Sequence, residues 1–154
     1  MFFKKYIRGT IQKQTVLEAT IFVTELTHAV RRACGLNTTH VYMNTRIIKH
    51  LYDKKPAEEF DFIIRNISLI VKFPDLIYKN KRGKRGEFCF VKDINDQKYL
   101  CVVENAVFAD DESEDVFIVT CFRVRDSKYL KDYKVFWSWK GGDLHRNAFD
   151  ASLR

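Results

Sequence analysis

The sequence predicts an α+β fold in which N-terminal helices pack on an antiparallel β-sheet of four or slightly more strands. Apolar residues at helical spacing dominate the first half of the chain, and runs rich in β-branched and aromatic residues dominate the second half. The 154 residues, 46% of them hydrophobic, suit one domain with its own core. Helices followed by an antiparallel sheet are typical of the α+β class.

The first 39 residues are predicted to form an extension of mixed strand and helix. Phe2 to Gln12 has the composition of an edge strand. Thr15 to Val23 favours a second strand, although its apolar spacing also fits a helix. Glu25 to Cys34 is predicted to be helical, with Thr24 as the N-cap and Gly35 at the C′ position.

Two amphipathic helices are predicted next. After a short extended piece at residues 40–43, Asn44 or Thr45 is expected to cap a helix that runs through Tyr52. A second helix is predicted from Ala57 to Lys72, and the proline two residues later is expected to end it.

The second half of the chain is predicted to form the sheet. Asn95-Asp96 is the expected hairpin turn between the first two strands, and Gly141-Gly142 is expected to end the last strand. The four predicted strands are Glu87 to Lys92, Lys98 to Glu104, Val116 to Val124 and Tyr133 to Lys140.

Charge points to a polyanionic partner. The net charge is +7 and the pI is near 9.2. Five of the seven residues from Lys79 to Arg85 are cationic, and they lead directly into an apolar strand that must be buried. A basic loop joined to a core strand holds its charges in a fixed direction, which suits phosphate binding. The predicted partner is therefore nucleic acid.

The remaining composition argues against several classes of protein. The four cysteines, Cys34, Cys89, Cys101 and Cys121, form no Cys-x-x-Cys pair, so buried free thiols are expected rather than a zinc site or disulfides. No run is long enough to span a membrane, and no apolar signal-peptide segment follows Met1, which predicts cytoplasmic synthesis.

An acidic run, Asp110 to Asp115, has five carboxylates in six residues. Such a run is usually a solvated loop. The alternatives are a metal cage, which the missing calcium-loop pattern disfavours, and a segment that repels nucleic acid toward the basic face.

Six short segments occur in order along the chain: RIIKHLYDK, a helix that ends in FPDLIYKN, then KRGKRGEFCFVK, KYLCVVE, VFIVTCFRVRDSKYL and WSWKGG. This order resembles the phage-associated nuclease-like domains grouped with barnase, EndoU, colicin nucleases and RelE. The resemblance covers roughly residues 40 to 142, so residues 1–154 are interpreted as a single nuclease-like domain.

The resemblance implies a helical layer on an antiparallel sheet, with RNA lying across the open sheet face. It also implies a metal-independent endoribonuclease without cofactor, used as a toxin or in conflict between phages or mobile elements, which forms a 2′,3′-cyclic phosphate. Its implied partners are RNA, with transfer RNA as one candidate, and an acidic immunity or antitoxin protein. The alternatives are a degenerate, non-catalytic nucleic-acid-binding module and a protein-interaction scaffold.

Five residues are candidates for catalysis. His50 matches the histidine of the family's helix motif, and its type suits proton transfer near neutral pH, although a histidine hydrogen-bonded to backbone is the simpler reading. Lys84 and Arg85 match the family's basic entry to the first core strand, and Thr120 matches a hydroxyl position. Arg123 is a candidate phosphate clamp, on the opposite strand face from Thr120 unless a bulge intervenes.

Further residues are candidates for RNA binding or for a second acid-base role. Glu87 is the alternative general base, although a neighbouring guanidinium would keep it ionised. Tryptophan at 139 is preferred over 137 as an exposed base-stacking ring, although packing in the core is more common for such residues. The predicted RNA-binding residues are Lys79, Lys81, Arg82, Tyr129 and Trp139.

Overall fold

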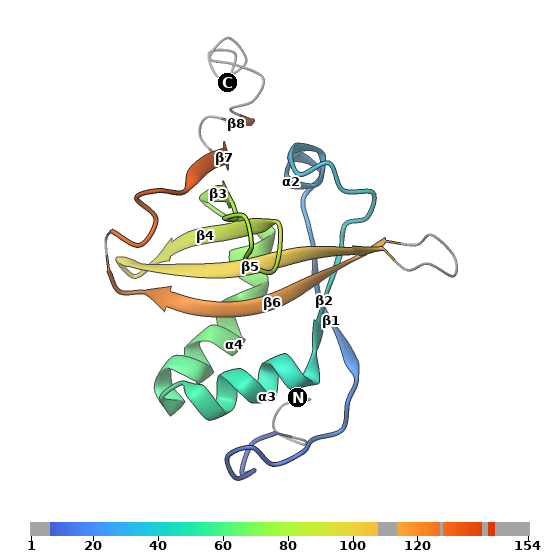
Figure 1. The fold of residues 1–154 in the computed structure, drawn as a ribbon, viewed down its shortest axis with the longest axis vertical. Coiled ribbons are helices and arrows are strands. Elements are labelled where there is room, and N and C mark those ends of the chain that lie inside the picture. The colour runs from blue at the N-terminus through green and yellow to red at the C-terminus, as the bar shows by residue number, and fades with distance from the viewer. Residues whose placement is uncertain (1–6, 108–113, 127, 140–141, 144–154) are drawn as a thin grey trace.

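An eight-stranded mixed sheet forms the centre of the protein (Figure 1). The computed structural model describes residues 7–107, 114–126, 128–139 and 142–143. The strand order is β1-β2-β6-β5-β4-β3-β7-β8. The strands are β1 (Thr20–Glu25), β2 (His40–Asn44), β3 (Leu76–Lys79), β4 (Phe88–Ile94), β5 (Gln97–Val107), β6 (Glu114–Val124), β7 (Lys134–Ser138) and β8 (Gly142–Asp143). The helices are α2 (His28–Ala33), α3 (Thr45–Lys54) and α4 (Ala57–Lys72).

The α+β class is confirmed, but the predicted arrangement is wrong in four respects. The sheet has eight strands rather than the predicted four or slightly more, and the helices follow strands rather than preceding all of them. Strands β2 and β6 pair in parallel, with Val41–Met43 beside Val116–Ile118. Strand β3 lies where a helix end was expected, because the helix ends at Phe73 and the chain after Pro74 pairs with β4 and β7.

The N-terminal predictions need similar correction. Residues 2–6 lie outside the described part of the chain, and Ile7 to Gln12 forms turns rather than a strand. Strand β1 begins only at Thr20. Thr24 pairs with Val41 in the sheet, so the cap of α2 is Thr27, whose side chain accepts a hydrogen bond from the Val30 backbone.

The central predictions agree closely with the structure. Asn44 caps α3 by accepting from the Arg46 backbone, and α4 has the predicted bounds. Gly35 follows α2 with φ +66°, and the hairpin turn places Asn95 and Asp96 at φ 52° and 63°. Strand β7 ends earlier than predicted, at Ser138. Lys140 and Gly141 lie outside the described residues, and Gly142 opens β8.

Only the last two residues of the acidic run, Glu114 and Asp115, lie in the described part of the chain. Residues 108–113 lie outside the described part of the chain, so the predicted solvated loop stays a prediction over these positions. Glu114 and Asp115 already belong to β6, where they pair with the last residues of β5. Glu114 also accepts a hydrogen bond from the Asn37 backbone at 3.3 Å. These two carboxylates are therefore part of the sheet rather than of a free loop.

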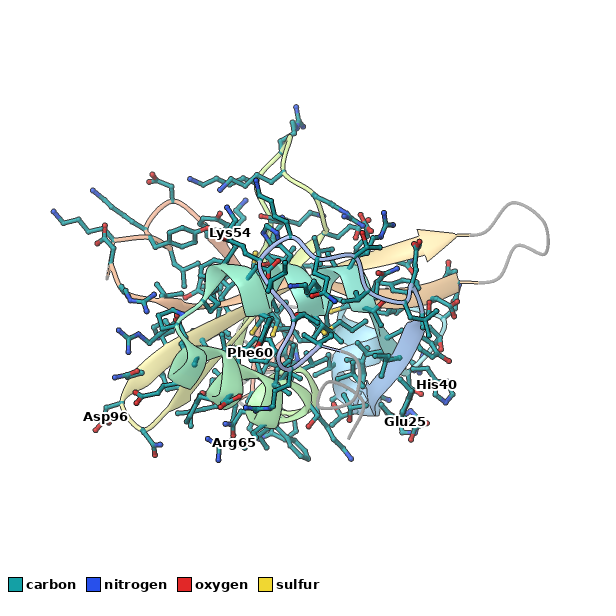
Figure 2. All side chains as sticks on the ribbon, turned by 90° about the horizontal axis from the view of Figure 1, so that it is seen from below. Glu25, His40, Lys54, Phe60, Arg65 and Asp96 are labelled. Atoms are coloured by element: carbon teal, nitrogen blue, oxygen red, sulfur yellow. The ribbon has the colours of Figure 1, made fainter. Side chains whose placement is uncertain are left out.

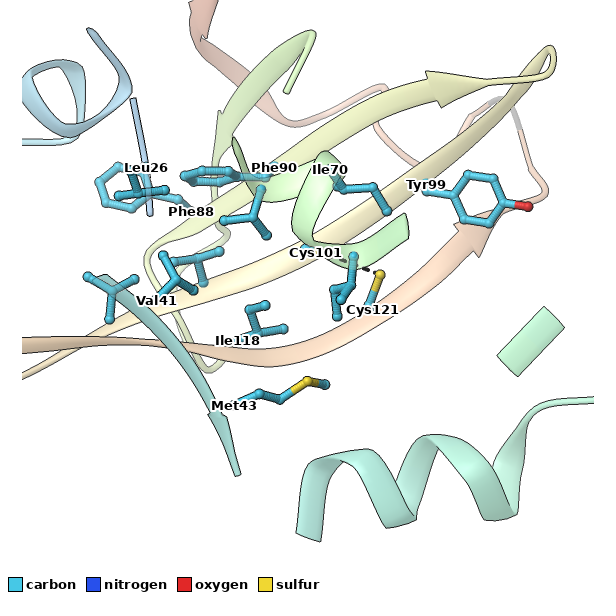
Figure 3. Close-up of a cluster of buried hydrophobic side chains, with 14 of the residues drawn as sticks. Leu26, Val41, Met43, Ile70, Phe88, Phe90, Tyr99, Cys101, Ile118 and Cys121 are labelled. Carbon is cyan, nitrogen blue, oxygen red and sulfur yellow. Dashed lines mark hydrogen bonds between the residues drawn. The ribbon is translucent and has the colours of Figure 1, made fainter. Parts of the chain in front are cut away.

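Helix α4 covers one face of the sheet and forms the main core with it (Figure 3). Ile70 of α4 packs over Phe90, Cys101 and Cys121, which come from neighbouring strands. The opposite face carries a smaller cluster that includes Val102 and Tyr133. We call this opposite face the loop face, because the β3–β4 loop crosses it in front of β5 (Figure 1).

All four cysteines are buried, as predicted. Burial raises the pKa of Cys89 to about 11, and burial beside Cys121 raises that of Cys101 as well. Both side chains therefore stay as thiols at neutral pH, which makes them poor nucleophiles. Among the residues that the structure describes, none of the helices has the length and apolar character that crossing a membrane requires.

The segment before β1 is bound along α3. Ile7 is fully buried. The buried ammonium group of Lys49 donates to the Ile11 carbonyl at 2.7 Å and to the Asp53 carboxylate. The Lys13 backbone donates to the same carboxylate at 2.9 Å. The Lys49–Asp53 pair therefore holds helix and segment together.

Asp53 is expected to make the unfolding free energy depend on pH. Burial alone would raise the pKa of Asp53, but hydrogen bonds from Lys49 and the Lys13 backbone, together with the Lys49 charge, outweigh it and lower the pKa. The folded pKa thus lies below the unfolded value of about 4, so the stabilisation is present above that value and is lost as the pH falls through the folded pKa.

Denaturant unfolding at a series of pH values checks this expectation. Asp53→Asn should show a shallower loss of stability than the wild type as the solution is acidified below about pH 4. Asp61→Asn is the matched control, because Asp61 forms a more exposed ion pair with Arg8. An Asp53→Asn protein with the wild-type slope would show that the pair contributes nothing to acid sensitivity.

Candidate active site

A cleft of about 470 Å³ lies between the first turns of α3 and the middle of β6. Three residues singled out from the sequence meet there, although they are far apart in the chain: His50, Arg85 and Thr120. The full lining is Asn44, Arg46, Ile47, His50, Arg85, Val119 and Thr120. The cleft therefore combines an imidazole, two guanidinium groups and a hydroxyl.

Helix α3 supplies one wall of the cleft. Its start is fixed by the Asn44 cap, and its buried face, which includes Ile48 and Leu51, packs into the core. Arg46 and His50 are four residues apart, so they lie on the same side of the helix. Both side chains are exposed, and Arg46 also pairs with Glu18 at 3.1 Å.

A β-bulge in β6 turns Thr120 toward the cleft. Val103 pairs with Ile118 and Val102 with Thr120, so Val119 has no partner in β5. The extra residue puts Val119 and Thr120 together on the loop face. Without the bulge, alternation would turn Thr120 away from the side that Val119 occupies.

The β3–β4 loop brings Arg85 to the same side. Asn80 donates to the carbonyls of Arg85 and Gly86 at 2.9 and 3.1 Å, which closes the loop on itself. Gly86 has φ +91°, and a Cβ there would lie 2.5 Å from Val102 Cγ1, so the chain passes the sheet where only glycine fits. The Arg85 side chain is 63% exposed, and its guanidinium forms a bidentate ion pair with Glu104, at 3.3 and 3.2 Å.

The family model described as phage-Barnase-EndoU-ColicinE5/D-RelE like nuclease3 matches residues 21–131, which include α3, the β3–β4 loop and β6. The chain belongs to this nuclease family. The match confirms the resemblance that was drawn from the sequence, and it begins earlier than residue 40, within the segment interpreted as an extension. Comparisons with curated proteins and with solved structures gave no match.

Two other catalytic candidates of the nuclease lie outside the cleft. Lys84 turns away from Arg85 and donates to the Tyr133 hydroxyl at 3.3 Å. This hydrogen bond and the nearby phenol groups raise the pKa of Lys84, so it stays cationic. Arg123 pairs with Tyr99 in the sheet, donates to Gln97 at 2.8 Å, and lies on the face that α4 covers.

The alternative general base is also occupied elsewhere. The Glu87 carboxylate accepts a hydrogen bond from the Asn105 backbone at 2.9 Å, and the Glu87 backbone donates to Val103. Glu87 is therefore tied to β5 at the base of the loop, where it helps to fix the loop rather than to face the cleft.

The predicted RNA-binding residues of the nuclease separate into two places. Lys79 ends β3, and Lys81 and Arg82 are exposed in the loop beyond it. Tyr129 lies on the loop face near Lys84. Trp139 is 47% exposed but packs on Phe73 near β7, four strands from β6 and so roughly 19 Å from the cleft.

Two cleft residues of the nuclease were missed in the sequence, Asn44 and Arg46. The signal for Arg46 is its spacing of four from His50 on a helix whose other face is apolar. Asn44 was recognised only as a cap. Its Oδ1 accepts from the Arg46 backbone, and the residue lines the cleft.

The arrangement suits an anionic substrate. A guanidinium offers parallel N–H donors to two phosphate oxygens, and a hydroxyl can donate to a third. His50 brings an imidazole to this cleft, the side-chain type best suited to proton transfer near neutral pH. Across the same part of the chain, no three His, Cys, Asp or Glu side chains are grouped to hold a metal ion.

Proposed function

We propose that this protein is an endoribonuclease that cleaves RNA through attack of the ribose 2′-hydroxyl. The observation that carries the proposal is the meeting of His50, Arg85 and Thr120 in one open cleft of a chain that belongs to a nuclease family. His50 was selected from the sequence for proton transfer, and Arg85 and Thr120 were selected for contacts to the phosphate. RNA is the proposed substrate because this mechanism needs the 2′-hydroxyl.

In this mechanism His50 accepts the proton of the 2′-hydroxyl while the 2′-oxygen bonds to phosphorus. The bond between phosphorus and the 5′-oxygen then breaks, and the 5′-oxygen takes a proton from solvent, which the open cleft admits. Arg85 and Arg46 hold the non-bridging oxygens as charge builds on them, and the Thr120 hydroxyl donates to the same phosphate. The products are a 2′,3′-cyclic phosphate and a 5′-hydroxyl.

The test is to incubate the protein with oligoribonucleotides in the presence of EDTA and to map both new ends. We expect cleavage undiminished by EDTA, with cyclic phosphate and 5′-hydroxyl ends. A substrate with one 2′-deoxynucleotide at the mapped position should resist cleavage there. Cleavage that stops with EDTA, or that cuts the deoxy linkage equally well, rules out this mechanism.

A non-catalytic binding module is the second candidate, favoured by the ion pairs that both cleft arginines already form. It predicts binding that weakens steeply with salt and no new RNA ends in the same experiment.

For the active enzyme we also propose an acidic inhibitor protein that covers Arg46 and Arg85 in the producing cell, as expected of a toxin. Purification from that cell at low salt, fully active and without an acidic partner, counts against the inhibitor.

A further inference from the structure

Three aromatic rings lie next to the cleft on the loop face. Phe122 follows Thr120 by two residues on β6, so the two side chains share a face and lie about 7 Å apart along the strand. Tyr129 meets Phe122 edge-on at 5.5 Å and stacks on Tyr133 at 5.8 Å, with the ring planes 19° apart. Tyr133 is buried, whereas Tyr129 remains 38% exposed.

Three lysines surround these rings. Lys84 Nζ lies 5.7 Å from the Tyr129 ring centre, Lys55 Nζ lies 5.6 Å from that of Phe122, and Lys81 Nζ lies 4.9 Å from that of Tyr133. In the described part of the chain none of these three ammonium groups pairs with a carboxylate. Rings and lysines together are called the aromatic-lysine patch.

We propose that the aromatic-lysine patch is a base subsite, in which Tyr129 stacks an unpaired RNA base beside the scissile phosphate and Lys84 and Lys55 hold flanking phosphates. The inference rests on the proposed function, since it takes the cleft as the place of cleavage. The Lys84 side chain turns from Arg85 toward Tyr133, so in this proposal Lys84 holds a different phosphate of the strand from the one that Arg85 holds.

The chemistry of the patch favours an unpaired base. Single-stranded nucleic acids bind where aromatic rings lie in a cationic groove, because every base has a face that can stack. In a duplex both faces of a base are covered by its neighbours, so a ring at the side of the strand has nothing to stack on. The patch therefore selects single strands or loops.

A second row of aromatic side chains on the sheet is less suitable. Phe22, Tyr42 and Phe117 form a row across β1, β2 and β6, with ring centres 5.9 and 6.0 Å apart. This row has an acidic neighbour. His40 contacts the Phe22 ring, and its imidazole lies 3.2 Å from the Glu25 carboxylate. Figure 2 shows Glu25 and His40 close together. Since carboxylates repel the RNA backbone, we assign the base subsite to the patch that carries lysines.

Binding is measured in the full-length His50→Ala protein, so that substrate is not consumed. Tyr129→Ala is expected to weaken binding of a labelled single-stranded oligoribonucleotide about 5- to 150-fold, the range for loss of one stacked base. Tyr129→Phe keeps the ring and should bind within about twofold of the parent. Phe22→Ala, which removes an exposed ring from the acidic row, is the matched control and should also bind like the parent.

Two further measurements guard against a folding defect. Binding of a duplex of the same sequence should be equally weak with and without the Tyr129 ring. A series of single strands, each with one abasic site at a different position, should include one, with the site near the cleavage position, that binds the parent protein more weakly. The same abasic site should not weaken binding to the Tyr129→Ala protein. Equal losses for single strand and duplex, no loss for Tyr129→Ala, or insensitivity to every abasic site each overturn the subsite.

The outcomes for the subsite and for the reaction are separable. If the wild type yields no cleavage products but binds single strands through Tyr129, the proposed function fails and the subsite stands. If the wild type cleaves RNA and Tyr129→Ala binds and cleaves like the parent, the subsite fails and the proposed function stands.

Discussion

The His50→Ala protein is expected to cleave RNA about 10²- to 10⁴-fold more slowly than the wild type, the range for loss of a general acid or base. Binding should change little, because Arg46, Arg85 and Thr120 still hold the phosphate. The measurement is kcat from single-turnover cleavage, together with Kd for an oligoribonucleotide that has a 2′-deoxynucleotide at the cleavage site. A fall in kcat at constant Kd is the signature of a group that acts in the reaction.

His40→Ala is the matched control. His40 is also an exposed histidine, but it is the first residue of β2, where it pairs with Glu25 (Figure 2). It should retain wild-type cleavage. If His50→Ala retains wild-type cleavage as well, His50 has no part in the reaction, and the proposed mechanism fails.

The sequence predicted the parts of the fold that depend on local signals. Helix α4 has apolar residues at regular helical spacing, and the Asn95-Asp96 turn has residues that tolerate positive φ, so both could be located from the sequence. The parallel pairing of β2 with β6 could not be predicted, because it joins segments more than 70 residues apart. Short strands such as β3 carry too few residues to show an alternating pattern.

The candidate site could be predicted only in part, because the directions of its side chains depend on contacts between segments far apart in the sequence. Lys84 and Arg85 are equivalent in the sequence, but the turn at Gly86 sends their side chains to different places, one to Tyr133 and the other to Glu104. Thr120 reaches the cleft through a bulge that the pairing with β5 creates. Arg123 was predicted to lie on the opposite strand face from Thr120 unless a bulge intervened, and because the bulge comes before Thr120, alternation places Arg123 on the face that α4 covers. The sequence shows which residue types are present, but the direction in which each side chain points depends on tertiary contacts.

Arg85→Ala is expected to lower kcat/KM for RNA by about 10²- to 10³-fold, the usual cost of removing one donor that stabilises charge in a transition state. Arg85→Lys should recover only part of this loss, because an ammonium group cannot hold two phosphate oxygens in the planar geometry of a guanidinium. Arg65→Ala removes an exposed arginine from α4 (Figure 2) and should cleave like the wild type. An Arg85→Ala enzyme with wild-type kcat/KM would remove Arg85 from the mechanism.

Glu104 determines how much of the Arg85 effect belongs to substrate binding. In the free protein the Glu104 carboxylate accepts hydrogen bonds from two nitrogens of the Arg85 guanidinium, so an RNA phosphate must replace it. Arg85→Ala also leaves this half-buried carboxylate unpaired beside the cleft, where it repels phosphate. The Arg85→Ala/Glu104→Gln double variant should therefore recover part of the loss, and Glu104→Gln alone should lower KM. If the double variant is no better than Arg85→Ala, the whole loss comes from the missing guanidinium, and Glu104 only orients it.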